Sequence, residues 1–159
     1  MKKYYFVVIL ICLMMAACFF PVDNDIWTEG FSLADTRGNP ATVFTSVGSF
    51  RIRFMIVNVL EDTLTFGYPM GVPIVRFEIT RDDSVIATSE DGNSYIGLPA
   101  VYFFCPGDTI RAEWLAPTTP DQFPKVVLAP GTYKARVISR LFDLEEISAP
   151  EDIAFSVIQ

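Results

Sequence analysis

The sequence contains no histidine, and its three cysteines are Cys12, Cys18 and Cys105. The lack of histidine excludes Ser-His-Asp catalysis, Cys-His catalysis and metal sites built on imidazole. Three cysteines, the first of them inside an apolar N-terminal run, are too few for a disulfide framework. We therefore expect Cys105 to be a small apolar residue near a turn rather than a reactive thiol.

Other catalytic patterns are also missing. No Ser-x-x-Lys pair and no glycine-rich phosphate loop occur in the sequence. The acidic pairs Asp82-Asp83 and Glu145-Glu146 are adjacent residues, which point to opposite faces of a strand or lie in a turn. Asp23-Asn24-Asp25 begins like a calcium loop, but Thr28 stands where such a loop requires glycine. We expect a protein that is not an enzyme and that holds neither a cofactor nor a metal.

Positive charge is scarce in this chain. There are 12 Lys and Arg residues against 19 Asp and Glu residues, which gives a net charge of -7. Without residues 1–17, which include Lys2 and Lys3 but no acidic residue, the net charge is two units lower, at -9. Because an acidic surface repels phosphate backbones, nucleic acid is not expected as a partner.

The N-terminal 18 residues have the order of an export signal. Lys2 and Lys3 precede an uncharged apolar run over residues 6–15, and Ala16-Ala17-Cys18 closes it. The ending Met-Ala-Ala-Cys resembles the lipobox of bacterial lipoproteins. This resemblance implies lipid transfer to the Cys18 sulfur, cleavage before Cys18 and acylation of the new amine, which would hold the protein on a membrane.

This interpretation gives a location and leaves two alternatives open. No acidic residue follows Cys18, so we expect a lipid-anchored protein of the cell envelope, on the outer membrane where the cell has two. The alternatives are ordinary cleavage after Ala17 and an uncleaved anchor helix over residues 4–20, which is at the short limit for spanning a bilayer. The predicted segments are a signal peptide (1–17), a lipidated cysteine with a tether (18–40) and one domain (41–159).

The domain itself has a period of two. Apolar residues alternate with polar ones in several runs, each separated from the next by turn-forming residues, which is typical of strands with one face in a core and one in water. The alternating apolar positions are Phe50 to Ile56, Leu64 to Phe66, Val75 to Ile79, Ile110 to Trp114, Tyr133 to Val137 and Ile153 to Val157. With no convincing helix between them, these runs predict an all-β antiparallel sandwich.

One turn gives more detail about this sandwich. Pro130-Gly131 leads into a strand that begins with Tyr133. In immunoglobulin-like sandwiches a tyrosine in this position packs inward, and its hydroxyl binds the preceding loop, an arrangement called a tyrosine corner. We therefore expect an immunoglobulin-like antiparallel β-sandwich, with Tyr133 in a structural role.

The order of motifs resembles the intracellular proteinase inhibitor family of the BsuPI type, over about residues 45–140. The residues that carry the resemblance are Asn58, Glu61 to Phe66, Gly71, Phe77 to Ile79, Asp82 to Ser89, Pro106 to Asp108, Trp114 and Pro130 to Tyr133. The chain departs from the family at Val72 to Val75, at the missing glycine of the Asp82–Ser89 turn and at Ile86. The resemblance implies an immunoglobulin-like fold and protease binding, but it transfers no reactive loop.

Two segments lie outside the alternating pattern and are expected to be loops. Residues 67–72 join two strands, and residues 89–104 are long and apolar for a connection. A substrate-like inhibitor needs a rigid, exposed, extended segment. The candidate partner-binding residues are Tyr68, Pro69 and Met70 in the first segment and Tyr95, Ile96 and Leu98 in the second.

The sequence leaves two functions open for this domain. The first is a membrane-tethered module that binds a protein partner, with a protease as one candidate. The second is a non-inhibitory structural or interaction module of the cell envelope, because fold does not fix function. A third interpretation of the candidate residues is purely structural, since the ends of a sandwich have to be covered.

Overall fold

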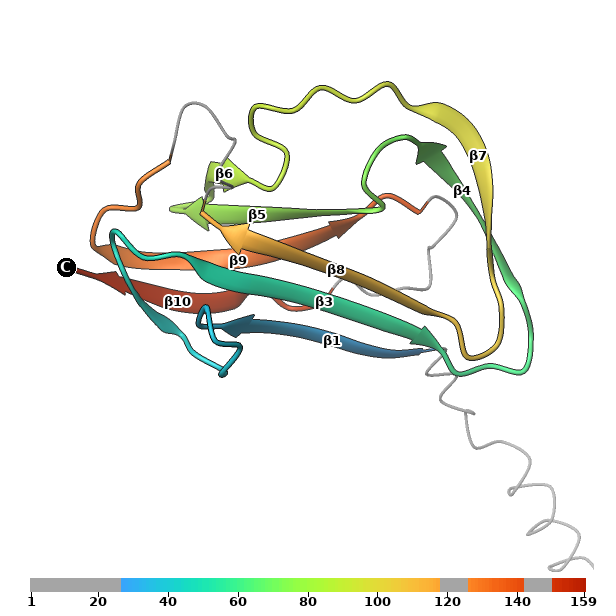
Figure 1. Ribbon diagram of the computed structural model, residues 1–159, viewed down its shortest axis with the longest axis horizontal. Coiled ribbons are helices and arrows are strands. Elements are labelled where there is room, and N and C mark those ends of the chain that lie inside the picture. The colour runs from blue at the N-terminus through green and yellow to red at the C-terminus, as the bar shows by residue number, and fades with distance from the viewer. Residues whose placement is uncertain (1–26, 118–125, 142–149) are drawn as a thin grey trace, which may run out of the picture.

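A computed structural model describes residues 27–117, 126–141 and 150–159, and these residues form an all-β structure (Figure 1). Cys18 and residues 1–17 lie outside the described residues. No helix that could span a membrane occurs in the described part of the chain. The ten strands are β1 (Trp27–Ala34), β2 (Val43–Thr45), β3 (Phe50–Asn58), β4 (Leu64–Met70), β5 (Val75–Arg81), β6 (Ser84–Thr88), β7 (Leu98–Phe104), β8 (Thr109–Ala116), β9 (Gly131–Ser139) and β10 (Ile153–Ile158).

The strands form two main sheets and one smaller ribbon. One sheet has the order β1-β3-β8, and the other has the order β2-β10-β9-β5-β6. Strands β4 and β7 pair only with each other, and this ribbon lies at one end of the molecule (Figure 1). The expected antiparallel pairing needs one correction, because β2 pairs with β10 in parallel. A three-residue strand at a sheet edge carries no sequence signal for its direction.

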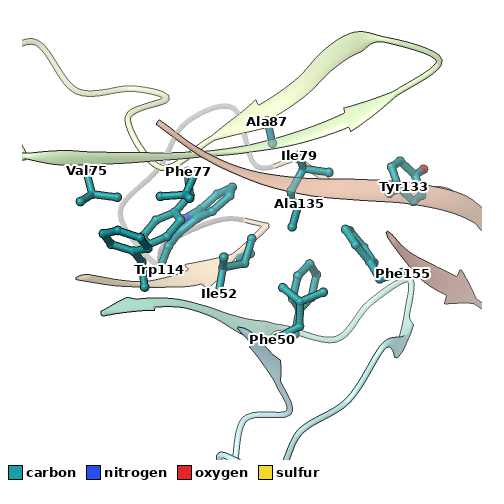
Figure 2. Packing of buried hydrophobic residues seen from close by; sticks show 14 of the residues in the cluster. Phe50, Ile52, Val75, Phe77, Ile79, Ala87, Trp114, Tyr133, Ala135 and Phe155 are labelled. Atoms are coloured by element: carbon teal, nitrogen blue, oxygen red, sulfur yellow. The ribbon is translucent and has the colours of Figure 1, made fainter. Parts of the chain in front are cut away.

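The core lies between the two main sheets and uses the predicted alternating positions. Figure 2 shows Phe50, Ile52 and Trp114 pointing from one sheet toward side chains of the other. Phe50 stacks on Phe44 with ring centroids 4.1 Å apart and also contacts Phe155 at 5.1 Å. Aromatic pairs of this kind add to the stability gained from burying their area. The predicted inward faces of β3, β5, β8, β9 and β10 are therefore confirmed.

The tyrosine corner is also confirmed. Tyr133 is buried, and its hydroxyl donates a hydrogen bond of 2.7 Å to the carbonyl oxygen of Ala129. The ring stacks on Phe155 at 5.6 Å, and the guanidinium of Arg81 lies 5.5 Å from its centroid. The hydroxyl therefore satisfies a backbone carbonyl of the loop that leads into β9, while the ring fills the core.

The start of the folded region differs from the expected one. We expected a tether over residues 18–40, but residues 27–34 form β1 and pair along their whole length with β3. Leu33 and Ala34 are buried, and Phe31 packs against the core. The sequence suggested a spacer because glycines, prolines and acidic residues surround this strand. Pairing with β3 and the burial of Leu33 and Ala34 outweigh those local signals.

Candidate functional site

The β4–β7 ribbon brings the two candidate segments together. Tyr68 lies opposite Ala100, and Met70 lies opposite Leu98. The expectation of two loops was therefore wrong for much of both segments, because residues 67–70 belong to β4 and residues 98–104 belong to β7. Residues 89–97 form no strand, and they contain Tyr95 and Ile96. Met70 and Leu98 thus meet at the end of the ribbon, and Ile96 adjoins them through Gly71. We call Met70, Ile96, its neighbour Tyr95 and Leu98 the tip; Tyr68 and Pro69 lie farther along β4.

Two glycines allow the chain segments at the tip to approach closely. Gly71 has a φ of 91°, and a Cβ atom there would lie 2.9 Å from the carbonyl oxygen of Ile96. A Cβ atom at Gly97 would lie 2.9 Å from the Cβ of Pro69. Both distances are too short for a side chain, so these positions require glycine. The backbone N–H of Val72 donates to the carbonyl oxygen of Pro69 at 3.1 Å and closes the turn.

The inner face of the ribbon is aromatic and packs against the core. The rings of Tyr68 and Tyr102 meet edge to face at 6.0 Å, and Tyr102 lies 6.1 Å from Phe104. Phe66 and Phe104 are buried, with ring centroids 6.5 Å apart. Burial raises the pKa of Tyr102, and the negative charge of Asp108 adds to this effect. The ribbon is therefore held on the sandwich by ring packing, and Tyr102 stays neutral at physiological pH.

The opposite face of the ribbon exposes apolar side chains. Because alternate residues of a strand point to opposite faces, Val101 and Phe103 point away from the core, and they are 56% and 63% exposed. Their partners across the ribbon, Gly67 and Thr65, have little side chain with which to cover them. We call Val101 and Phe103 the outer face. The sequence analysis missed both residues because β7 is apolar at successive positions and shows no alternation.

The tip is exposed as well. Ile96 is 85% exposed, Leu98 is 56% exposed and Met70 is 49% exposed. A shallow hollow of about 220 Å³ lies beside them, lined by Gly67, Tyr68, Pro69, Gly97, Pro99 and Ala100. No residue that lines this hollow carries a charged side chain. The tip can therefore offer an apolar contact surface.

Asn58 fixes the base of the ribbon to the three-stranded sheet. This buried residue donates from its side-chain amide to the carbonyl oxygens of Phe104 at 2.7 Å and Asp62 at 2.9 Å. Its side-chain oxygen accepts from the backbone N–H of Leu60 at 3.0 Å. The chain leaves β3 just after Asn58 and enters β4 at residue 64, so these bonds bind both strands of the ribbon to one point.

A second surface feature lies on the outer side of the three-stranded sheet. A groove of about 440 Å³ there is bordered by Gly30, Met55 and Arg111, together with Arg53 and Glu113. Glu113 forms salt bridges with Arg51 and Arg53, the latter at 2.7 Å. The hydrogen bond from Arg53 lowers the pKa of Glu113, and Arg51 contributes in the same direction. The lining carries two arginines, Arg53 and Arg111, against Glu113, so this groove has a net positive charge, unlike the uncharged hollow at the tip.

No three metal-binding side chains lie together anywhere in residues 27–117, 126–141 and 150–159. Cys105 is exposed in the turn between β7 and β8, and its backbone N–H donates to the carboxylate of Asp108 at 2.8 Å. The expected position near a turn is confirmed for Cys105, although the side chain is not buried.

Comparison with known proteins identifies no family for this chain. No family model matches, and no curated protein matches. Among solved structures 26 chains match, one of them the β-glucosidase EmGH1 from Erythrobacter marinus. That match has 11% sequence identity and a TM-score of 0.39, and it covers 83% of this chain but 16% of the enzyme chain. A similarity this distant carries no argument about the function of the present protein.

Proposed function

We propose that this protein is a lipid-anchored binding module of the cell envelope, and that the tip of the β4–β7 ribbon contacts a protein partner. The lipid would be attached at Cys18, as the lipobox-like ending of the leader implies. The sandwich, which we take to be immunoglobulin-like on the strength of its tyrosine corner, would serve as a rigid support. In a two-membrane cell the expected location is the outer membrane.

The exposure of Leu98 and Met70 at the end of the ribbon, and of Ile96 in the segment that adjoins Gly71, carries this proposal. Isolated exposed apolar residues are common, but a group of them close together is typical of an interaction surface. The strand pairing and the glycine contacts restrict the tip before any partner binds. Such restriction lowers the entropy lost on binding, so a small apolar surface can still contribute affinity.

Protease inhibition is a more specific version of the same function. It is favoured by residues 89–97, which form no strand and include the largely exposed Ile96, and by the resemblance to the BsuPI-type inhibitor family. A substrate-like inhibitor needs an extended segment that a protease cleft can accommodate. Tyr68, Pro69 and Met70 meet this requirement less well, because they are paired with β7. Within this proposal, Ile96 is therefore the expected contact residue for a protease.

The test uses the detergent-solubilised full chain as bait for cross-linked envelope proteins, with protease activity assayed in parallel. We expect a specific protein to be captured by the unchanged chain and by the control Val85→Asp, since Val85 is an exposed residue of β6. Ile96→Asp and Met70→Asp should lose it. Equal capture by all variants would refute the tip as the binding surface. Capture without any loss of protease activity would refute inhibition and retain the binding module.

A further inference from the structure

We propose that the outer face of the ribbon, Val101 and Phe103, rests on the lipid surface to which the chain is anchored. This inference depends on the proposed lipid at Cys18. It concerns a different surface from the tip, because Val101 and Phe103 point to the side of β7 opposite Leu98.

The position where the chain enters the fold is the first argument. Strand β1 begins at Trp27, which lies opposite Asn58 in the register with β3. The side chain of Asn58 binds the carbonyl oxygen of Phe104, the last residue of β7. The N-terminal end of the described chain therefore lies beside the base of the ribbon, while the C-terminus lies at the opposite end of the molecule (Figure 1).

The length of the connecting chain is the second argument. Trp27 is nine positions after Cys18 in the sequence, and nine steps of extended chain span about 30 Å at most. The seven residues of β7 add about 23 Å along the ribbon. Phe103 is next to the end of β7 that lies at the base, so it stays within reach of the bilayer surface. The tip, at the other end of the ribbon, is held farther from the anchor.

The chemistry of the surface is the third argument. A phenylalanine and a valine stand together on the outer face, and Val59 is exposed just beyond Asn58 at the same base. Phenylalanine is among the side chains that membrane-surface segments bury at the boundary between headgroups and acyl chains. Two or three such side chains bind weakly alone, but the anchor makes the contact intramolecular and gives it a high effective concentration.

Nearby acidic residues indicate which lipids fit. Glu61 and Asp62 lie in the exposed turn between β3 and β4, and Asp108 lies in the turn between β7 and β8. Their carboxylates would be repelled by an anionic membrane surface. The outer face should therefore contact a surface of zwitterionic lipid, such as phosphatidylethanolamine, and should be displaced when phosphatidylglycerol is added.

Cys105 provides a probe for the test. It is exposed and lies two residues after Phe103. In the lipidated chain the sulfur of Cys18 is blocked and Cys12 has been removed, so Cys105 is the single free thiol. The lipidated protein is labelled there with an environment-sensitive dye and placed in phosphatidylcholine–phosphatidylethanolamine vesicles that carry a spin-labelled quenching lipid. We expect a blue-shifted, strongly quenched dye.

Variants then separate this contact from the tip. The double variant Val101→Asp, Phe103→Asp should lose most of the quenching, whereas Ile96→Asp and Val85→Asp should keep it. Near-ultraviolet circular dichroism checks that each variant is folded. Adding phosphatidylglycerol should weaken the quenching of the unchanged protein.

Each opposite outcome has a distinct meaning. A mass spectrum without lipid on Cys18 would overturn both the proposed anchor and this inference. A lipidated protein whose dye stays in water in every vesicle would overturn the contact alone. Quenching that appears in native membranes but not in pure lipid vesicles would assign the outer face to a protein partner and would also overturn the lipid contact.

Discussion

The strongest test of the fold is the removal of the Asn58 side chain. Asn58→Ala deletes three hydrogen bonds, to Phe104, Asp62 and Leu60, at the point where the ribbon joins the sheet. A hydrogen bond contributes about 1 kcal/mol net, and a buried group left without a partner costs about 1–3 kcal/mol. The expected loss in the free energy of unfolding is therefore about 3 kcal/mol, which lowers Tm by roughly 6–12 °C.

A second substitution at the same position tests the cause of this loss. Asn58→Asp keeps the size of the side chain but replaces the amide donor with an oxygen that faces the carbonyls of Phe104 and Asp62. Repulsion between these oxygens should make this variant less stable than Asn58→Ala at neutral pH. The matched control is Asn93→Ala, which makes the same chemical change at an exposed turn residue and should cost less than about 0.5 kcal/mol.

The assay is urea unfolding followed by the fluorescence of the buried Trp114, with hydrogen exchange of the β4 and β7 amides measured in parallel. Asn58→Ala should lower the protection of these amides before that of β5 and β9, because the ribbon is held at its base by this side chain. A loss below about 1 kcal/mol, or equal stability of the Ala and Asp variants, would refute the assignment of Asn58 as the residue that fixes the ribbon.

Three further predictions concern single contacts. Tyr133→Phe should lower the free energy of unfolding, measured in urea, by about 1 kcal/mol, because it deletes the hydrogen bond from the hydroxyl to the preceding loop. An unchanged stability would contradict the structural role of this hydroxyl. Gly71→Ala should displace the tip, since the new Cβ atom would collide with the carbonyl of Ile96, and changed amide shifts confined to residues 67–72 and 95–98 would show it. Glu113→Gln should lower stability by about 0.5–1 kcal/mol at neutral pH, because solvent screens the exposed salt bridges. The pKa of Glu113 is lowered in the folded state by Arg53, so its contribution is complete above about pH 5 and is lost as the pH falls through the lowered pKa of the folded protein. If the free energies of unfolding of the unchanged protein and of Glu113→Gln still differed by the same amount at low pH, the salt bridges of Glu113 would not be the cause of the difference.

Some strands could be predicted from the sequence because their two faces differ. Strands β3, β8 and β9 each turn one face to the core, so buried residues recur at every second position along much of their length, mostly with polar residues between them. Tyr133 could be assigned to a corner because Pro130-Gly131 sets a turn immediately before it. These features depend on residues that are close in sequence, so the sequence alone reveals them.

Other elements depend on distant pairing and could not be predicted. Strand β1 is defined by its register with β3, and nothing local separates residues 27–34 from the spacer before them. The parallel pairing of β2 with β10 joins segments more than 100 residues apart. For the candidate site, the sequence selected Met70 and Leu98 separately, but only the register of β4 with β7 places them opposite each other.

The failure of the alternation at β7 is itself informative about function. Residues 98–104 are apolar on both faces, yet β7 belongs to a two-stranded ribbon with one face on the core and one away from it. Threonine or serine would satisfy the outer positions of such a strand and would favour solubility. Phe103 and Val101 stand there instead, and the small side chains across the ribbon leave them uncovered. Strand β7 departs from the alternating pattern on its exposed face, and we therefore expect that face to contact another surface. The same reasoning applies to any sandwich that carries an isolated ribbon.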